Sequence, residues 1–128
     1  MINELLWFPT NKCLIDGSWE HTKTKDEIDL INLSDGKILS KIARGSETDV
    51  TNAVYAAKNA LKTKWGGKTA VERGRILLRM SQLVLKYSKK LALLESLDVG
   101  KPISQSQNDV TALARYLEFY GGAADKIH

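Results

Sequence analysis

The spacing of apolar residues changes once along this chain, near Ser46. Before that residue, apolar and polar side chains alternate, and clusters of Asp, Asn, Gly and Ser interrupt the alternation. After it, apolar residues recur every three or four positions. A period of two is typical of a strand with one wet face, and a period near 3.6 is typical of an amphipathic helix. The sequence therefore predicts two N-terminal β-hairpins followed by three to four amphipathic helices.

The part before Ser46 contains two hairpin signals. Asp16-Gly17 separates two short extended segments, and this pair readily adopts the positive φ angles of a two-residue primed turn. A longer turn cluster, residues 32–36, also lies between two extended segments. The four strands are therefore expected at residues 13–15, 18–20, 27–31 and 37–42.

Capping signals mark the first two helices. Ser46 is followed three residues later by Asp49, and Thr69 is followed three residues later by Glu72. In such a pair the hydroxyl oxygen accepts a hydrogen bond from a free amide of the first turn, and the acidic side chain lies at the positive end of the helix dipole. We expect the first helix to run to Trp65, where a pair of glycines follows, and the second helix to begin at Thr69.

Two further helical segments follow. Residues 91–97 continue the helical pattern and stop at Gly100, with Pro102 just beyond, which is typical of a helix end. Ser106 and Asp109 repeat the capping spacing, so the last helix is expected to begin at Ser106.

Gly121 and Gly122 fall inside this last helix. Each glycine costs roughly 1 kcal/mol relative to alanine in a helix, so we expect another element, either of this chain or from outside it, to pack closely against them. The sequence shows no repeat and no linker, and residues 1–128 are therefore expected to form one incomplete domain with no internal boundary.

Composition narrows the class of protein. Hydrophobic residues are 43% and charged residues 27% of the 128 positions, which excludes a disordered or collagen-like chain. The formal net charge of +4 is scattered along the sequence, so nucleic-acid binding is disfavoured. A single cysteine, Cys13, excludes an internal disulfide and favours a reducing, cytoplasmic location. No segment approaches the ~18 apolar residues of a membrane span, so no membrane partner is expected.

No catalytic constellation is recognisable in the residues. The glycines form no nucleotide-binding loop, and residues 66–69 only resemble the tail of one, because Lys62 stands where the first glycine would be. Cys13 lies in an expected strand with no histidine nearby to activate its thiol, so a half-buried structural residue is the favoured interpretation. His21 and His128 have no partner in the sequence. We assign no catalytic and no cofactor-binding residue to this chain.

Several segments, taken in order, resemble the N-terminal segment of the NAD(P)-dependent aldehyde dehydrogenase superfamily. The strongest is residues 94–102, LESLDVGKP, followed at a family-like distance by RYLEFYGGAADK at residues 115–126. Each segment is weak alone, and the shared order and spacing carry the resemblance. In one departure, Leu33 stands where the family usually has proline. The other matching segments are residues 14–19, 31–39, 50–65 and 72–77.

The resemblance implies an α/β parent enzyme, of which this chain would form the N-terminal, incomplete part of the cofactor-binding domain. In the family a cysteine thiolate attacks the aldehyde, a hydride passes to the nicotinamide, and a glutamate-activated water releases the acid. The residues for those steps would lie after His128, so the chain alone is expected to be inactive. The aldehyde substrate, the NAD or NADP cofactor and a homo-oligomeric assembly are expected of the parent.

The resemblance also implies two sets of site residues. Asp98 matches a position that in some members binds a structural monovalent cation, together with main-chain oxygens from the region of Leu30 and Ile31. Local capping or pairing of Asp98 near the helix end is the favoured alternative from the sequence. In the family the last helix lies near the mouth of the substrate tunnel, so the candidates for aldehyde contact are Ala112, Leu113 and Tyr116.

Two other classes of function stay open at this point. A non-catalytic, stand-alone interaction module would bind a full-length dehydrogenase, or itself, through exposed apolar faces. A small basic DNA-binding protein would show duplex affinity that falls steeply with added salt.

Overall fold

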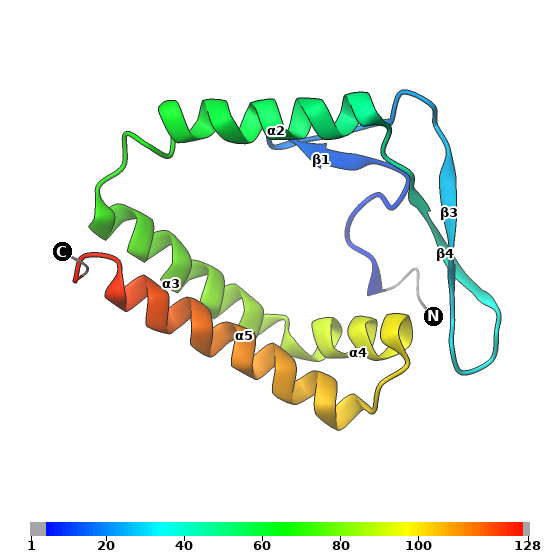
Figure 1. Cartoon of the computed structure of the whole chain (residues 1–128). Coiled ribbons are helices and arrows are strands. Elements are labelled where there is room, and N and C mark those ends of the chain that lie inside the picture. The colour runs from blue at the N-terminus through cyan, green and yellow to red at the C-terminus, as the bar shows by residue number, and fades with distance from the viewer. Residues whose placement is uncertain (1–4, 127–128) are drawn as a thin grey trace. The chain divides into compact units, whose positions relative to one another are not determined.

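The computed structural model describes residues 5–126. The chain divides into two compact units, Met1–Lys64 and Trp65–His128, each of which is described by itself (Figure 1). The first unit contains strands β1 to β4 and helix α2, and the second contains helices α3, α4 and α5. The predicted fold of two hairpins followed by helices is confirmed. The assignment of residues 1–128 to one incomplete domain with no internal boundary stays a prediction.

The first hairpin joins β1 (Cys13–Ile15) to β2 (Ser18–Glu20), with Leu14 opposite Trp19. Asp16 has φ 50° and Gly17 has φ 80°, which are the left-handed angles that a primed two-residue turn requires. The ring of Phe8 stacks on that of Trp19 with 6.0 Å between centroids. This ring contact attaches the N-terminal segment to the hairpin.

The second hairpin pairs β3 (Glu27–Ile31) antiparallel with β4 (Ile38–Ala43) and has an irregularity at Leu30/Ile31. Its turn closes through the N–H of Gly36, which donates to the carbonyl of Asn32 at 2.8 Å while Gly36 has φ 70°. The N–H of Ala43 donates to the carbonyl of Thr10 at 2.9 Å. The N-terminal segment is therefore also bonded to the end of β4.

Helix α2 (Glu47–Lys62) begins with the predicted capping box. The Asp49 carboxylate accepts hydrogen bonds from the N–H and Oγ of Ser46, at 2.8 and 2.7 Å, and from the N–H of Lys23 at 3.4 Å. The prediction that this helix reaches Trp65 is wrong. The helix ends at Lys62 because Thr63 leaves the helical conformation and its hydroxyl donates to the carbonyl of Asn59 at 2.8 Å.

Helices α3 (Ala70–Lys86) and α4 (Ser88–Val99) are separated only by Tyr87, whose φ of −103° and ψ of 14° interrupt the helix. Helix α3 begins with the predicted Thr69–Glu72 capping box. Helix α4 starts earlier than residue 91 and ends at Gly100, which has φ 74° as a left-handed cap requires. The predicted stop at Gly100 is confirmed.

Helix α5 (Ile103–Ala123) begins directly after Pro102, so the prediction that it starts at Ser106 is wrong. Pro102 has φ −57°, an angle compatible with entry into a helix, and the N–H of Ser106 already donates to its carbonyl at 3.2 Å. Ser106 lies inside the helix with 0% of its surface exposed, and its Oγ has no hydrogen-bond partner among residues 5–126. The serine that has the spacing of a helix cap is therefore a buried residue inside the helix.

The interface between α3 and α5 is built from small residues. A Cβ added to Gly121 would lie 2.9 Å from the carbonyl oxygen of Gly74, and one added to Gly74 would collide with the carbonyl oxygen of Gly121. The Ser81 hydroxyl donates to the Ala114 carbonyl at 2.8 Å. Close packing at Gly121 is confirmed, whereas a Cβ at Gly122 would meet nothing within 4 Å in the described part of the chain, so a close neighbour at Gly122 stays a prediction.

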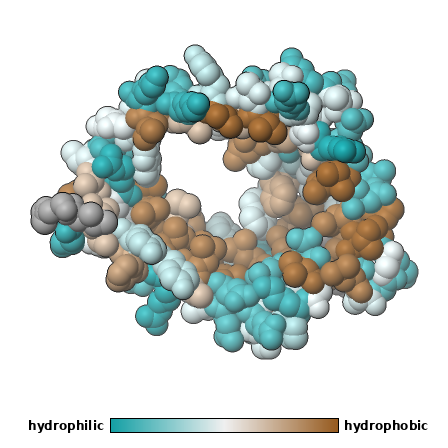
Figure 2. Space-filling model, viewed as in Figure 1, coloured by the Kyte–Doolittle hydropathy of each residue, from teal (hydrophilic) through white to brown (hydrophobic). Residues whose placement is uncertain are grey.

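Apolar residues that the helical pattern places on one stripe remain accessible in both units. Val50 of α2 is 60% exposed, and Met80 of α3 and Leu113 of α5 are 46% and 48% exposed. Figure 2 shows such apolar surface on α2 and along the helices of the second unit. Among residues 5–126, every helix is too short or too polar to cross a membrane.

Candidate functional site

The outer face of α5 carries the largest group of exposed aromatic side chains in the described part of the second unit. Tyr116, Phe119 and Tyr120 are 64%, 68% and 58% exposed. Together with Ala112 and Arg115 they line a hollow of about 520 Å³. The rings of Phe119 and Tyr120 meet edge to face with 5.3 Å between centroids. We call these five residues the α5 outer face.

Two of the three aldehyde-contact candidates, Ala112 and Tyr116, belong to the α5 outer face. Leu113 does not. It lines a separate hollow of about 350 Å³ together with Leu91, Val110 and two acidic residues, Glu95 and Asp109. The structure thus brings Ala112 and Tyr116 together and places Leu113 beside α4.

Lys101 links the two acidic residues of that second hollow. Its ammonium lies 2.5 Å from the carboxylate of Glu95 in α4 and 2.5 Å from that of Asp109 in α5. The hydrogen bond to Asp109 and then that to Glu95 raise the pKa of Lys101. The Lys101 carbonyl also accepts a hydrogen bond from Ser96 Oγ at 2.7 Å. Lys101 therefore fixes the corner between α4 and α5.

The residues proposed for a monovalent cation lie in different units. Leu30 and Ile31 belong to β3 of the first unit, and Asp98 lies in the last turn of α4 in the second. Asp98 is exposed, and its carboxylate makes no hydrogen bond or ion pair with any residue from 5 to 126, so local pairing of this side chain is not observed. The cation site stays a prediction.

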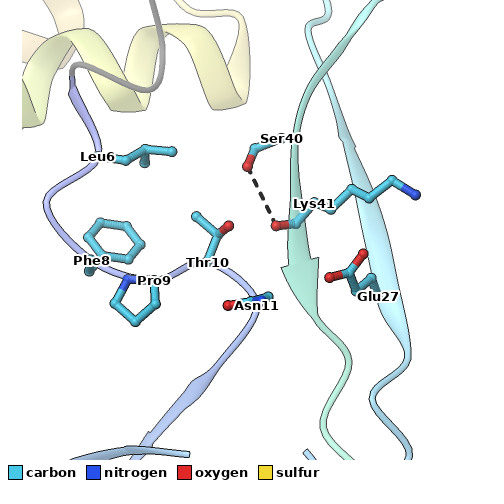
Figure 3. A pocket seen from close by; sticks show the side chains of 8 residues that line it. All are labelled: Leu6, Phe8, Pro9, Thr10, Asn11, Glu27, Ser40 and Lys41. Carbon is cyan, nitrogen blue, oxygen red and sulfur yellow. Dashed lines mark hydrogen bonds between the residues drawn. The ribbon is translucent and has the colours of Figure 1, made fainter. Parts of the chain in front are cut away.

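A third hollow, of about 500 Å³, lies in the first unit between the N-terminal segment and the second hairpin (Figure 3). Leu6, Phe8 and Thr10 are among its lining residues on one side, and Ser40 and Lys41 of β4 lie on the other. The Lys41 side chain extends away from the N-terminal segment, and its ammonium lies 3.5 Å from the Asp29 carboxylate. These side chains offer no general acid paired with a nucleophile.

Residues with catalytic or metal-binding chemistry are not gathered in the described part of the chain. No group of three or more His, Cys, Asp or Glu side chains there could hold a metal ion. Cys13 is half-buried in β1, and His21 is exposed in the loop that follows β2. His128 lies outside the described residues. The interpretation of Cys13 as a structural strand residue agrees with this placement.

At the start of α3, which follows the glycine pair, polar groups of residues 68–73 are hydrogen-bonded to one another. Glu72 Oε2 accepts hydrogen bonds from the N–H of Thr69 at 2.7 Å and from Thr69 Oγ1 at 3.0 Å. The Lys68 carbonyl accepts a hydrogen bond from Arg73 at 2.9 Å. The Glu72 carboxylate therefore closes a capping box on the N-cap residue Thr69. No cofactor contact is assigned to these residues.

Two features of these surfaces were not identified from the sequence. Arg115 and Phe119 were not among the site candidates, although Phe119 follows Tyr116 by three positions and so shares its helix face. Lys101 carried no signal of its role, because its partners Glu95 and Asp109 lie in two different helices and fit no single helical period.

Comparison with known proteins gives one consistent result. The model of the aldehyde dehydrogenase family matches residues 19–128. The chain is 35% identical over 130 residues to aldehyde dehydrogenase family 2 member B4, mitochondrial, of Arabidopsis thaliana, covering 100% of this chain and 24% of that protein. It is 33% identical over 113 residues to betaine aldehyde dehydrogenase of Bacillus subtilis, covering 88% of this chain and 23% of that protein.

Solved structures agree with this result. A point mutant of the betaine aldehyde dehydrogenase of Staphylococcus aureus, in complex with NAD+, matches with a TM-score of 0.88 and 28% identity over 92% of this chain and 24% of its own. PnpE in complex with nicotinamide adenine dinucleotide matches with a TM-score of 0.88 and 38% identity over 94% of this chain and 25% of its own. The chain spans about a quarter of the length of the relatives it matches.

Proposed function

Because the chain belongs to the aldehyde dehydrogenase family, we propose that it forms the N-terminal portion of the cofactor-binding domain of an enzyme that oxidises an aldehyde to a carboxylic acid with NAD or NADP. The observation that carries the proposal is the family match over residues 19–128. Two solved relatives are complexes with the nicotinamide dinucleotide, which supports this cofactor for the longer enzyme. The cytoplasmic location and the homo-oligomeric state of that enzyme belong to the same proposal.

By itself, the chain is proposed to be inactive. The single cysteine, Cys13, lies half-buried in β1, and no group of three or more His, Cys, Asp or Glu side chains within residues 5–126 could hold a metal ion. What the chain contributes is the set of hairpins and helices described above, and on α5 it presents Ala112 and Tyr116 as residues that face the aldehyde. Leu113 is kept as a third candidate, although it lines the neighbouring hollow.

The experiment has two arms. In the first, the purified chain is supplied with an aldehyde and NAD or NADP, and the absorbance of the reduced nicotinamide is followed; we expect no increase. In the second, a longer polypeptide that carries this segment is assayed in the same way, and we expect turnover. Turnover by the chain alone would contradict the proposed inactivity, and an inactive longer protein with a complete catalytic domain would contradict the proposed oxidation.

A second candidate function is that of a non-catalytic interaction module. One observation favours it: the aromatic side chains of the α5 outer face stay more than half exposed in the described part of the chain. Sedimentation distinguishes it from an orphaned segment. A cooperative, well-defined species supports the module, and open-ended aggregation argues against it.

A further inference from the structure

One residue, Lys101, joins α4 to the start of α5 by charged bonds. It lies in the three-residue link between Val99 of α4 and Ile103 of α5 (Figure 1). Its ammonium lies 2.5 Å from the carboxylate of Glu95 and 2.5 Å from that of Asp109. No side chain within residues 5–126 caps the first turn of α5. The polar connection of this helix start to α4 therefore passes through Lys101.

Asp109 shares a side of α5 with the residues that the proposed function assigns to the aldehyde. Ala112, Leu113 and Tyr116 follow it by three, four and seven positions, a spacing that keeps side chains on one side of a helix. Leu113 also lines the hollow of about 350 Å³ that Glu95 and Asp109 line. We call Ala112, Leu113 and Tyr116 the aldehyde side of α5.

The contacts of α5 with α3 hold a different side of the helix. Ala114 accepts the hydrogen bond of Ser81 through its carbonyl, and Gly121 packs against Gly74. Ala114 and Gly121 are buried, seven positions apart, and both lie in the second half of α5. A helix that is held along one side can still roll about that side. The bond of Lys101 to Asp109 lies on another side and in the first half of the helix, so it opposes this roll.

We propose that Lys101 is a positioning residue for aldehyde binding, because its bonds to Glu95 and Asp109 fix the rotation of α5 and so the direction in which the aldehyde side faces. The inference rests on the proposed function, since it requires that α5 contacts the aldehyde in the longer enzyme. Lys101 is not itself a contact of the substrate. It acts through the helix that carries the contacts.

This role predicts a particular change in the kinetics. Side chains that surround the apolar part of a substrate bind it about equally before and during the reaction. Losing such contacts raises KM and leaves kcat nearly unchanged. A large aldehyde contacts more of the aldehyde side than a small one, so misplacing α5 should weaken the binding of the large one more.

The first experiment uses the longer enzyme that carries this segment, with Lys101→Met. Methionine keeps an unbranched apolar chain and removes the ammonium. KM for an aromatic aldehyde should rise at least about fivefold, whereas kcat and KM for the dinucleotide should stay within about twofold. KM for acetaldehyde should rise less. A variant that had only lost stability would show a smaller active fraction, which lowers the apparent kcat for both aldehydes alike and leaves both KM values unchanged.

Two further variants serve as controls. Lys101→Arg keeps a cation that can bond both carboxylates, and it should keep KM within about twofold of the unmodified enzyme. Lys126 lies just after α5, and its ammonium is 2.5 Å from the carboxylate of the adjacent Asp125, so its ion pair joins no two helices. Lys126→Met should leave every kinetic constant unchanged.

A double substitution tests whether Lys101 acts through Asp109. Asp109→Asn alone should raise KM for the aromatic aldehyde in the same direction as Lys101→Met. When the two are combined, KM should stay within about twofold of that of Lys101→Met, because the bond is already absent. A multiplied effect would show that the two side chains act separately and would overturn the proposed route.

The second experiment needs no activity. In the purified chain, Lys101→Met should speed amide exchange in residues 107–113 and leave the exchange of Gly74 and Ser81 in α3 unchanged. Unchanged exchange in residues 107–113 would overturn the claim that Lys101 holds α5.

Two kinetic results would also overturn the proposal: unchanged KM values for both aldehydes in Lys101→Met, or a rise that Lys101→Arg does not reverse. Inactivity of the unmodified longer enzyme would instead contradict the proposed function, and amide exchange would still decide whether Lys101 holds α5. Failure of the inference and failure of the proposed function are therefore distinguishable.

Discussion

The two units of this chain acquire their structures in different ways. In the first unit, the turns and the start of α2 are formed by residues close in sequence, such as the turn at Asp16-Gly17 and the capping box of Asp49, and longer hydrogen bonds such as that from Ala43 to Thr10 join these parts. Thr22 and Asp49, both polar, are the only buried residues among its described residues. In the second unit, order comes from contact between helices, centred on Gly74 and Gly121. Local signals therefore determine the turns and caps of the first unit, and shape complementarity determines the contact between α3 and α5 in the second.

We expect the largest effect from a substitution at the closest contact of the second unit, between Gly74 and Gly121. Gly121→Ala would put a Cβ 2.9 Å from the Gly74 carbonyl oxygen and 3.2 Å from the backbone nitrogen of Leu78. Both obstacles are backbone atoms, so relief requires that α3 and α5 move apart. We expect the free energy of unfolding to fall by about 2–3 kcal/mol, measured by urea denaturation followed by circular dichroism.

The control is the neighbouring glycine. A Cβ on Gly122 meets nothing within 4 Å, and Ala is the better helix former, so Gly122→Ala should raise stability by up to about 1 kcal/mol. Equal effects of the two substitutions would show that helix propensity, rather than the contact with α3, determines the cost.

This contrast explains which parts of the fold could be predicted from the sequence. The turn at Asp16-Gly17 and the capping boxes of α2 and α3 were predicted correctly, because their signals lie within a few neighbouring residues. The start of α5 was not, because Ser106 has the residue type of a cap and the environment of a core. Small residues such as Gly74 and Ser81 count as gaps in an apolar pattern, although they are the centre of the helix contact.

The second prediction concerns two buried serines of the second unit. Replacing each by alanine should change the free energy of unfolding in opposite directions. Ser81 Oγ donates to the Ala114 carbonyl at 2.8 Å, whereas Ser106 Oγ has no partner among residues 5–126. Ser81→Ala should lower the free energy of unfolding by about 1 kcal/mol, and Ser106→Ala should raise it by about 1 kcal/mol. Urea denaturation of both variants under identical conditions measures the difference. Destabilisation by Ser106→Ala would reveal a hydrogen bond or a water bridge to its hydroxyl.

The third prediction tests local order in the first unit. Gly17 has φ 80°, which an L side chain adopts at a cost of about 1 kcal/mol, so Gly17→Ala should loosen the first hairpin by that amount. Amide hydrogen exchange measures the effect, and it should be confined to residues 13–20. Faster exchange in α3 and α5 as well would contradict the view that the hairpin is stabilised locally.

The candidate site follows the same division. Ala112 and Tyr116 were identified from a resemblance of short segments, and one helix carries both into the same hollow. The contact of Lys101 with Glu95 and Asp109 could not be predicted from the sequence, because it depends on how α4 and α5 pack together. The aldehyde-contact role of these residues and the cation role of Asp98 stay predictions, because they require parts that a segment of a quarter of the family length does not contain.

The smallest expected effect is a response to acid that should differ between the two capping boxes. The N–H of Ser46 and then its hydroxyl lower the pKa of Asp49, and the N–H of Thr69 and then its hydroxyl lower the pKa of Glu72. A carboxyl group that binds its proton less tightly in the folded state stabilises that state above its unfolded pKa. This contribution to stability begins to fall when the pH drops below the unfolded pKa of about 4. It is lost once the pH has passed below the lowered pKa of the folded state.

Asp49 is buried and also accepts a hydrogen bond from Lys23, 26 positions away, whereas Glu72 is hydrogen-bonded to Thr69 alone among the residues that the structure describes. Acid should therefore lower the protection of amides against exchange, relative to their intrinsic rate at each pH, both at the start of α2 and in residues 22–25, but in the second unit only at the start of α3. Asp49→Ala at neutral pH should reproduce the wider response, and Glu72→Ala the narrower one. If Asp49→Ala left residues 22–25 unchanged, the bond from Lys23 would contribute nothing to the order of that loop, and the two boxes would be equivalent local caps.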